Sequence, residues 1–245
     1  MTDDITLAAR RHTRALVAAV AAVVLLVVAV VGMLAATVGR RGNPAPAPPS
    51  ATAATADPTA PQPLPSTPTA LRWVTVFGAH LPEGAEGPRD TSAGRARGFT
   101  HTPMGAVFAA AHISLRLSPQ AGPAVFEPTL REQVVGPDAN RLLGNLEDEY
   151  QELRAQLGVT PGEPAGQLYS TVTGYRIGSA SPDAVEVGLL IEGPGQSGLA
   201  RVALSVQMRW VDDDWALQAP SGGDWNTAAV LVPSTVGYTG FPAGG

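Results

Sequence analysis

An apolar run of 25 residues without a charge, residues 15–39, constrains this chain more than any other feature. About 20 consecutive apolar residues are enough to cross the hydrocarbon core of a bilayer as a helix. A cleaved signal peptide is the alternative, but its apolar region is usually about 7–15 residues long. The longer run, which Arg40 and Arg41 close, therefore predicts an uncleaved transmembrane helix.

The residues around this run predict which end of the chain faces the cytoplasm. Three arginines (Arg10, Arg11 and Arg14) precede the run and two follow it, and positive flanks favour the cytoplasmic side. We expect residues 1–14 to form a cytoplasmic tail and the remainder of the chain to lie outside the cytoplasm. The predicted location is the cell membrane, with a single pass.

Residues 40–70 are predicted to form a disordered tether. From Asn43 to Ala70, Pro, Ala, Ser and Thr supply 24 of 28 residues, including nine prolines. Such a composition cannot bury a core and stays extended. At about 3.1 Å per residue, the segment would reach on the order of 80 Å. We therefore expect a domain that is held away from the membrane.

Composition limits the chemistry of the outer domain, residues 71–245. The chain has no cysteine, which excludes disulfides, thiolate metal sites and cysteine nucleophiles. The domain carries 11 arginines against 18 acidic residues, a net charge of −7. Because an acidic surface repels phosphate backbones, we expect no nucleic-acid partner. Neither a cofactor nor a metal is predicted.

Helical signals occupy the first half of the domain. Thr102 and Pro103 are typical of an N-cap and a first helical position. Gly158 and Pro161 are typical of residues that follow the end of a helix. We expect a strand over 71–77, a long loop over 78–102, a helix over 103–117, one or two short helices around 126–135 that Pro119 and Pro128 interrupt, and a helix from 138 to 157.

Strand signals occupy the second half, where the apolar period changes from 3.6 to 2. One face of each strand is apolar in three successive segments, which predicts an antiparallel sheet with one side covered by helices. Alternate residues from Tyr169 to Ile177, from Val185 to Ile191 and from Ala200 to Trp210 are expected to share one face of each strand. We expect a solvated turn at 212–214, a strand at 215–218 and an irregular tail over 226–245.

Helices followed by a meander of strands predict an α+β domain. A bent sheet that wraps around helices forms a cone with an open mouth, as in the NTF2-like (cystatin-like) fold. The predicted fold is therefore one N-terminal transmembrane helix and one NTF2-like domain, in which helices pack on a bent antiparallel sheet.

Short motifs give no catalytic signature. The run from Gly193 to Gly198 fits G-x-G-x-x-G, but a dinucleotide site needs a helix next, and a period-2 strand follows here. We interpret it as a hairpin loop. Asp212 to Asp214 lack the alternating layout of a calcium loop. The acidic patch Glu147 to Glu149 is typical of a solvated helix face, and an Arg-rich partner is the alternative interpretation.

Five side chains are candidates for a pocket or an interaction surface. A cone pocket lined by the first helix and the strands would use His101, His112, Tyr169 and Tyr175. Either histidine could act as a general base in such a pocket. Phe99 precedes the helix cap, where it could pack as a hydrophobic staple. We assign none of them a catalytic, cofactor-binding or metal-binding role.

The stretch from Trp73 to His112 resembles a family of small membrane proteins from actinobacterial integrative and conjugative elements. The matching residues are Trp73, Leu81-Pro82, Gly87-Pro88, the run from Gly98 to Pro103, Gly105-Ala106 and the alanines at 109–111. The family has no established activity, so the resemblance implies an association with mobile-element genes. An anchored NTF2-like domain is also similar in plan to scaffold proteins of conjugation machines.

These observations predict a non-enzymatic, membrane-anchored envelope protein. We expect it to serve a conjugation- or secretion-type assembly, with protein partners in the envelope and with the polar face of the sheet and the long loop as contact surfaces. A homo-oligomer is compatible with this role. The alternatives are an NTF2-like small-ligand binder or enzyme, and an accessory subunit of another envelope complex, such as a lipid transporter.

Overall fold

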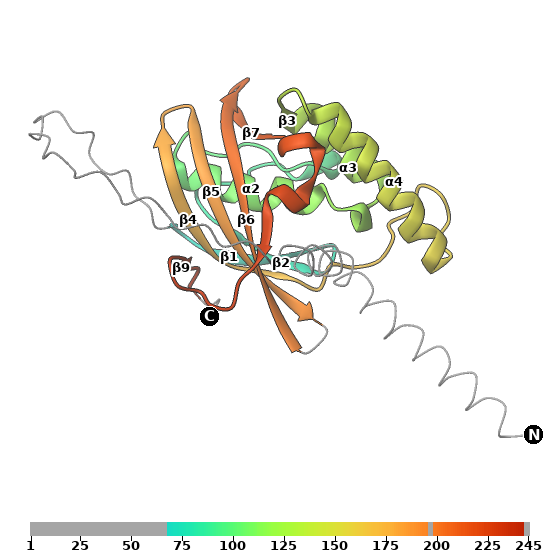
Figure 1. Cartoon of the computed structure of the whole chain (residues 1–245). Helices are drawn as coiled ribbons and strands as arrows, with labels where there is room; N and C mark the ends of the chain where they lie inside the picture. The colour runs from blue at the N-terminus through green and yellow to red at the C-terminus, as the bar shows by residue number, and fades with distance from the viewer. Residues whose placement is uncertain (1–67, 196–197, 243–245) are drawn as a thin grey trace, which may run out of the picture.

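The computed structural model describes residues 68–195 and 198–242. These residues form one α+β domain with three helices and a curled, nine-stranded sheet, in which the first two helices contact the sheet and the third packs on the second (Figure 1). The predicted cytoplasmic tail, transmembrane helix and most of the tether lie outside the described residues. Within the described part, no helix is long and apolar enough to cross a membrane.

The central helix, α2 (Pro103–Arg116), begins where the sequence predicts. The Thr102 hydroxyl accepts a hydrogen bond from the backbone N–H of Gly105 at 3.1 Å, and Pro103 occupies the first turn. Gly105 is required because a Cβ there would overlap the Thr100 carbonyl oxygen. Small residues, including Ala106 with 0% exposure, let the helix lie against the sheet. The expected cap and packing are confirmed.

The helix α3 (Pro123–Gln133) begins earlier than expected and continues through Pro128. We predicted that Pro128 would break this stretch, because proline removes one helical hydrogen bond. That prediction is wrong. Phe126 and Leu130 are 0% and 3% exposed, and the burial of such side chains outweighs the loss of one bond.

The long helix α4 (Ala139–Leu157) follows the predicted pattern. Gly158 ends it in the left-handed conformation, with φ of 69°, which glycine adopts at little cost. Leu142, Leu146 and Tyr150 form its buried stripe. The opposite side of α4 faces solvent, so this helix is the outer layer of the domain (Figure 1).

The sheet runs in the order β1-β2-β4-β5-β6-β7-β3, and α2 packs on its inner face. The pairs β4–β5, β5–β6 and β6–β7 are antiparallel, as predicted. Gly195 pairs with Gly198, so the glycine motif is a hairpin end. The strands are β1 (Arg72–Val76), β2 (Ala79–Glu83), β3 (Val134–Val135), β4 (Thr171–Ser181), β5 (Ala184–Gly195), β6 (Gly198–Val211) and β7 (Asp214–Gln218).

The predicted loop over 78–102 contains an additional strand. Phe77 and Gly78 turn the chain, and β2 then pairs antiparallel with β1. The sequence pattern hides this strand because Pro82, which cannot donate to a sheet, lies inside it. The remainder of the loop is held by backbone hydrogen bonds, including Arg97 N–H to the Asp90 carbonyl at 2.8 Å.

We predicted that alternate residues from Tyr169 to Ile177 share one face of a strand, and this prediction is wrong for the first half of the segment. Tyr169 precedes β4, has a φ of 44° and is 51% exposed. The β4–β5 register shifts between Val172 and Gly174, so an extra residue reverses the alternation. Val172 and Tyr175 therefore face the core, with exposures of 3% and 2%.

The turn at 212–214 is solvated only in part. Asp212 and Asp213 have φ of 51° and 61°, which is the geometry of a tight hairpin turn. Asp214 instead accepts hydrogen bonds from the backbone N–H groups of Gly98 at 2.8 Å and Phe99 at 3.2 Å. This carboxylate fixes the entry to α2, which corrects the expectation of a solvated triplet.

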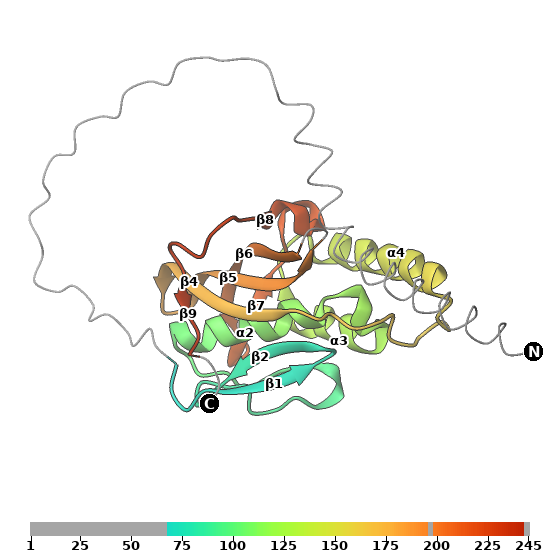
Figure 2. The same cartoon turned by 90° about the horizontal axis from the view of Figure 1, so that it is seen from below.

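The C-terminal segment contains two short strands, where we expected an irregular tail. It adds β8 (Ala229–Leu231) beside β6 and β9 (Thr239–Gly240) beside β4. Between them, residues 232–238, here called the strap, cross the outer face of the sheet (Figure 2). Leu190 and Ala203 lie on that outer face and are only 2% and 5% exposed.

Candidate functional site

The five candidate side chains do not converge on one cavity. Phe99 and His112 are neighbours, with ring centroids 6.1 Å apart. His101 instead stacks on Trp210, and Tyr175 packs against Phe241. Tyr169 lies on the surface. The curl of the sheet thus separates residues that the sequence suggested as one group.

His112 is completely buried within α2 and is held by two partners. An Arg116 guanidinium nitrogen, Nη1, lies 3.2 Å from Nδ1 of His112. Because arginine can only donate, Nδ1 is the acceptor, and Nε2–H donates to the Pro82 carbonyl oxygen at 3.0 Å. This network assigns the neutral tautomer and fastens α2 to β2.

Burial, together with the nearby charge of Arg116, lowers the pKa of His112 from 6.5 to about 3. The hydrogen bond to Pro82 opposes this shift. The ring is 0% exposed, so no substrate can reach it in the folded state. His112 is therefore a structural group rather than a general base.

Arg116 is the second buried polar group of this cluster. It is 3% exposed, and its Nε has no hydrogen-bond partner among the described residues. Burial lowers the pKa of Arg116 to about 10, and the charge of Glu83 opposes the shift. Glu83 in turn binds Arg72 at 2.7 Å. The cluster links the β1–β2 hairpin to α2.

His101 fixes the turn between β4 and β5. Its ring stacks on Trp210 with centroids 4.0 Å apart and an interplanar angle of 9°. Its Nε2 lies 2.8 Å from the Pro182 carbonyl oxygen and 3.0 Å from a carboxylate oxygen of Asp183. Because both neighbours are acceptors, Nε2 carries a proton. The His101 and Asp183 side chains are 41% and 70% exposed, so this pair lies on open surface.

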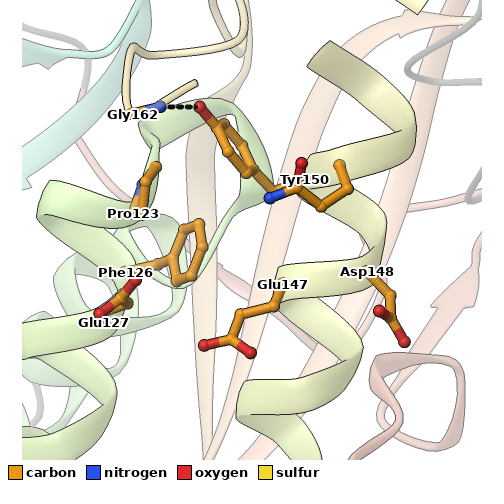
Figure 3. A pocket seen from close by; sticks show the side chains of 8 residues that line it. Pro123, Phe126, Glu127, Glu147, Asp148, Tyr150 and Gly162 are labelled. Carbon is orange, nitrogen blue, oxygen red and sulfur yellow. Dashed lines mark hydrogen bonds between the residues drawn. The ribbon is translucent and has the colours of Figure 1, made fainter. Parts of the chain in front are cut away.

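A pocket of about 390 Å³ lies between α3 and α4 (Figure 3). Phe126 and Tyr150 form its floor, and the Tyr150 hydroxyl is saturated by Gly162 N–H at 2.8 Å and the Glu163 carbonyl at 2.9 Å. Carboxylates line its rim: Glu127, Glu147 and Asp148. Such a rim attracts cationic groups, as the patch on α4 suggested.

The acidic patch on α4 has few cations to balance it. Glu127 binds Arg131 at 2.9 Å, whereas Glu147, Asp148 and Glu149 have no ion pair within the described residues. Burial, with the charges of Asp224 and Glu152, raises the pKa of Glu149. No group of three metal-ligating side chains gathers anywhere in residues 68–195 and 198–242.

The edge strand β8 is a surface that sequence patterns did not single out. Of the described strands, β8 pairs only with β6, so no described strand pairs with its other edge. Val230 and Leu231 are 56% and 42% exposed. The run of apolar residues from Ala228 to Val232 is the signal that could have identified this edge.

Comparison with known proteins gives a family but no activity. Residues 35–240 match a family model described as "Domain of unknown function (DUF8175)". No curated protein and no solved structure matches the chain. The matched range covers most of the 245 residues, including the whole described domain except its last two residues. The chain therefore belongs to the DUF8175 family of proteins.

Proposed function

We propose that this protein is a membrane-anchored envelope protein whose outer domain is a non-enzymatic scaffold or accessory of a conjugation- or secretion-type assembly. In this proposal the apolar run over 15–39 is the anchor, and the tether carries the domain outside the cytoplasm. Its partners are proteins of the envelope, and it takes no cofactor.

The packed interior is the observation that carries this proposal. Small-molecule sites are concave and need open space between side chains. Here the inner face of the sheet is filled by large side chains, among them Phe108 and Met208, each with 0% exposure, and the 390 Å³ pocket lies outside this core, between α3 and α4. The buried His112 is likewise inaccessible. The exposed apolar edge of β8 is suited to contact with a protein instead, because open sheet edges readily accept another strand.

We also propose that the domain is NTF2-like. Three helices precede the long antiparallel strands, and the sheet curls around α2, which supports this classification. Two features go beyond the expected plan: the β1–β2 hairpin in front of α2, and the C-terminal strands β8 and β9. Fold-level analogy to conjugation scaffolds supports the function only weakly, so the contact surface must be tested directly.

The test is site-specific photocrosslinking of the full-length protein in cells that express it. A photoreactive amino acid replaces Val230 or Leu231 on β8, and the matched control replaces the exposed Gln156 on α4. We expect adducts with transfer or secretion subunits from β8 but not from Gln156. Equal labelling at all positions, or no protein adduct, would refute the scaffold proposal.

The same experiment separates the alternative envelope role. Adducts with subunits of another envelope complex, such as a lipid transporter, would favour an accessory function there. Membrane fractionation of the same cells tests the anchor independently. Recovery of the full-length chain in the soluble fraction would refute the anchored topology, whichever partner is found.

A further inference from the structure

Thr239 and Gly240 are bound as an added strand on the edge of β4 that β2 covers only at Thr171. Gly240 lies opposite Gly174, and Thr239 lies opposite Tyr175. The backbone N–H of Phe241 donates to the Thr173 carbonyl at 3.0 Å. Main-chain pairing of this kind is how many proteins bind extended peptides.

An aromatic socket receives the side chain that follows this strand. The Phe241 ring lies 4.8 Å from the ring centroid of Tyr175, 6.1 Å from that of Phe108 and 6.2 Å from that of Trp73. Phe241 is 8% exposed. The Trp73 indole N–H also donates to the Pro242 carbonyl at 3.2 Å. The socket therefore contacts both an aromatic side chain and the backbone beside it.

The backbone of β4 is adapted to this close contact. A Cβ at Gly174 would lie 3.0 Å from the Thr239 carbonyl oxygen, which is tighter than side chains normally pack. Glycine at this position lets the incoming strand approach. Pairing, socket and glycine together make a built binding site that residues 239–242 occupy.

The strap connects residues 239–242 to the rest of the domain. Its length therefore determines whether this segment can bind to the β4 edge of its own molecule or to that of another. The strap runs from β8, which pairs with β6, across β5 to β9, which pairs with β4, a distance of about four strand spacings, or roughly 19 Å. Seven extended residues reach about 23 Å, so the strap has little slack, and short hinges of this kind favour exchange of a segment between copies. In the middle of the strap, Val236 is 86% exposed. Next to β9, the Arg176 guanidinium carbon lies 5.4 Å from the centroid of the Tyr238 ring.

We propose that the socket exchanges its occupant between copies, so that residues 239–242 of one molecule fill the β4 edge of a second. The second copy is the occupant of choice because its segment is identical to the one seated in the structure. Every contact made by β9 and Phe241 can form equally well in trans, which makes such exchange a low-cost route to oligomers.

Local concentration sets how much exchange occurs. A short link gives the segment an effective concentration on the order of millimolar for its own socket. Exchange therefore needs copies that are held at a similar local concentration, which the membrane anchor of the proposed function would supply. The inference rests on that function only for this concentration, and the membrane fractionation described above tests the anchor separately.

Disulfide trapping tests the exchange in the full chain, which contains no native cysteine. One copy carries Arg176→Cys and a differently tagged copy carries Tyr238→Cys, the two positions that face each other beside β9. We expect a mixed-tag, disulfide-linked dimer after oxidation of membranes from cells that co-express both. The double variant R176C/Y238C should instead form an internal link when expressed at low level.

Two controls make the result decisive. Arg209→Cys paired with Tyr238→Cys places an exposed cysteine on β6, away from β9, and reports random collision. An excess of a peptide with the sequence of residues 236–245 should reduce the mixed dimer at least severalfold, whereas the same peptide with Phe241→Ala should not. A mixed dimer no more abundant than the Arg209 control, with the internal link formed, would overturn the proposal.

Discussion

The buried neutral His112 predicts a loss of stability in mild acid. Burial and Arg116 lower the pKa of His112 to about 3 in the folded state, whereas the unfolded chain has an ordinary value near 6.5. Between these values the unfolded chain binds more protons than the folded one. Stability is therefore complete above pH 6.5 and falls as the pH decreases towards 3.

The size of the effect follows from one proton. The slope approaches about 1.4 kcal/mol per pH unit, which gives roughly 2 kcal/mol between pH 7 and 5 and about 4 kcal/mol by pH 3. A domain is usually stable by only about 5–15 kcal/mol, so the smaller loss is already measurable. Most carboxylates stay ionised above pH 5, and comparison with a variant that lacks His112 isolates the contribution of this histidine.

Urea unfolding of the full chain in detergent measures this loss. All four tryptophans lie within the described domain, so their fluorescence reports on that domain. With a slope of about 2 kcal/mol per molar urea, the midpoint should fall by about 1 M from pH 7 to 5. His112→Gln should remove most of this dependence, whereas the exposed His80→Gln should retain it.

Parallel midpoint shifts in the wild type and His112→Gln would refute the reasoning. They would mean that His112 is protonated or hydrated in the folded state, and that its contacts with Pro82 and Arg116 are not the ones described. A lower but pH-independent midpoint for His112→Gln would support it, because lost packing changes stability at every pH and only the lost titration changes the slope.

Five further substitutions test the packing of the domain, each by urea unfolding. Phe241→Ala should cost about 3–5 kcal/mol, as for other buried phenylalanines. Asp214→Ala should cost on the order of 2 kcal/mol because it leaves loop N–H groups without their acceptor, whereas Asp213→Asn in the adjacent turn should be nearly neutral. Gly105→Ala should destabilise strongly, because its Cβ overlaps the Thr100 carbonyl oxygen, whereas Gly144→Ala in α4, whose Cβ meets nothing within 4 Å, should stabilise by about 1 kcal/mol.

Local signals predicted the elements whose cause is local. Thr102 and Pro103 begin α2, and Gly158 ends α4, because caps act on the adjacent turn. The alternation of apolar and polar residues predicts the buried faces of β5 and β6 because the pairing of these strands has no register shift. In contrast, Pro128 was given too much weight, because the burial of α3 depends on residues distant in sequence.

Non-local pairing explains most of what the sequence could not reveal. β8 and β9 are three and two residues long and exist because β6 and β4 offer them edges. The grouping of His101 with Trp210, and of Tyr175 with Phe241, likewise depends on the curl of the sheet. Choosing candidates by residue type identified side chains that pack well, but not a shared site.

The positions of the two chain ends give the proposed anchor a further consequence. Trp73, near the start of the domain, binds Pro242 near its end, so the tether enters beside the socket that holds the C-terminal segment. The acidic helix α4 lies on the other side of the domain (Figure 1). The proposed tether therefore attaches on the socket side of the domain, away from α4. In the proposed anchored protein, the sockets of neighbouring copies would then lie on the side nearer to their tethers, where exchange of the C-terminal segment between copies is geometrically easiest.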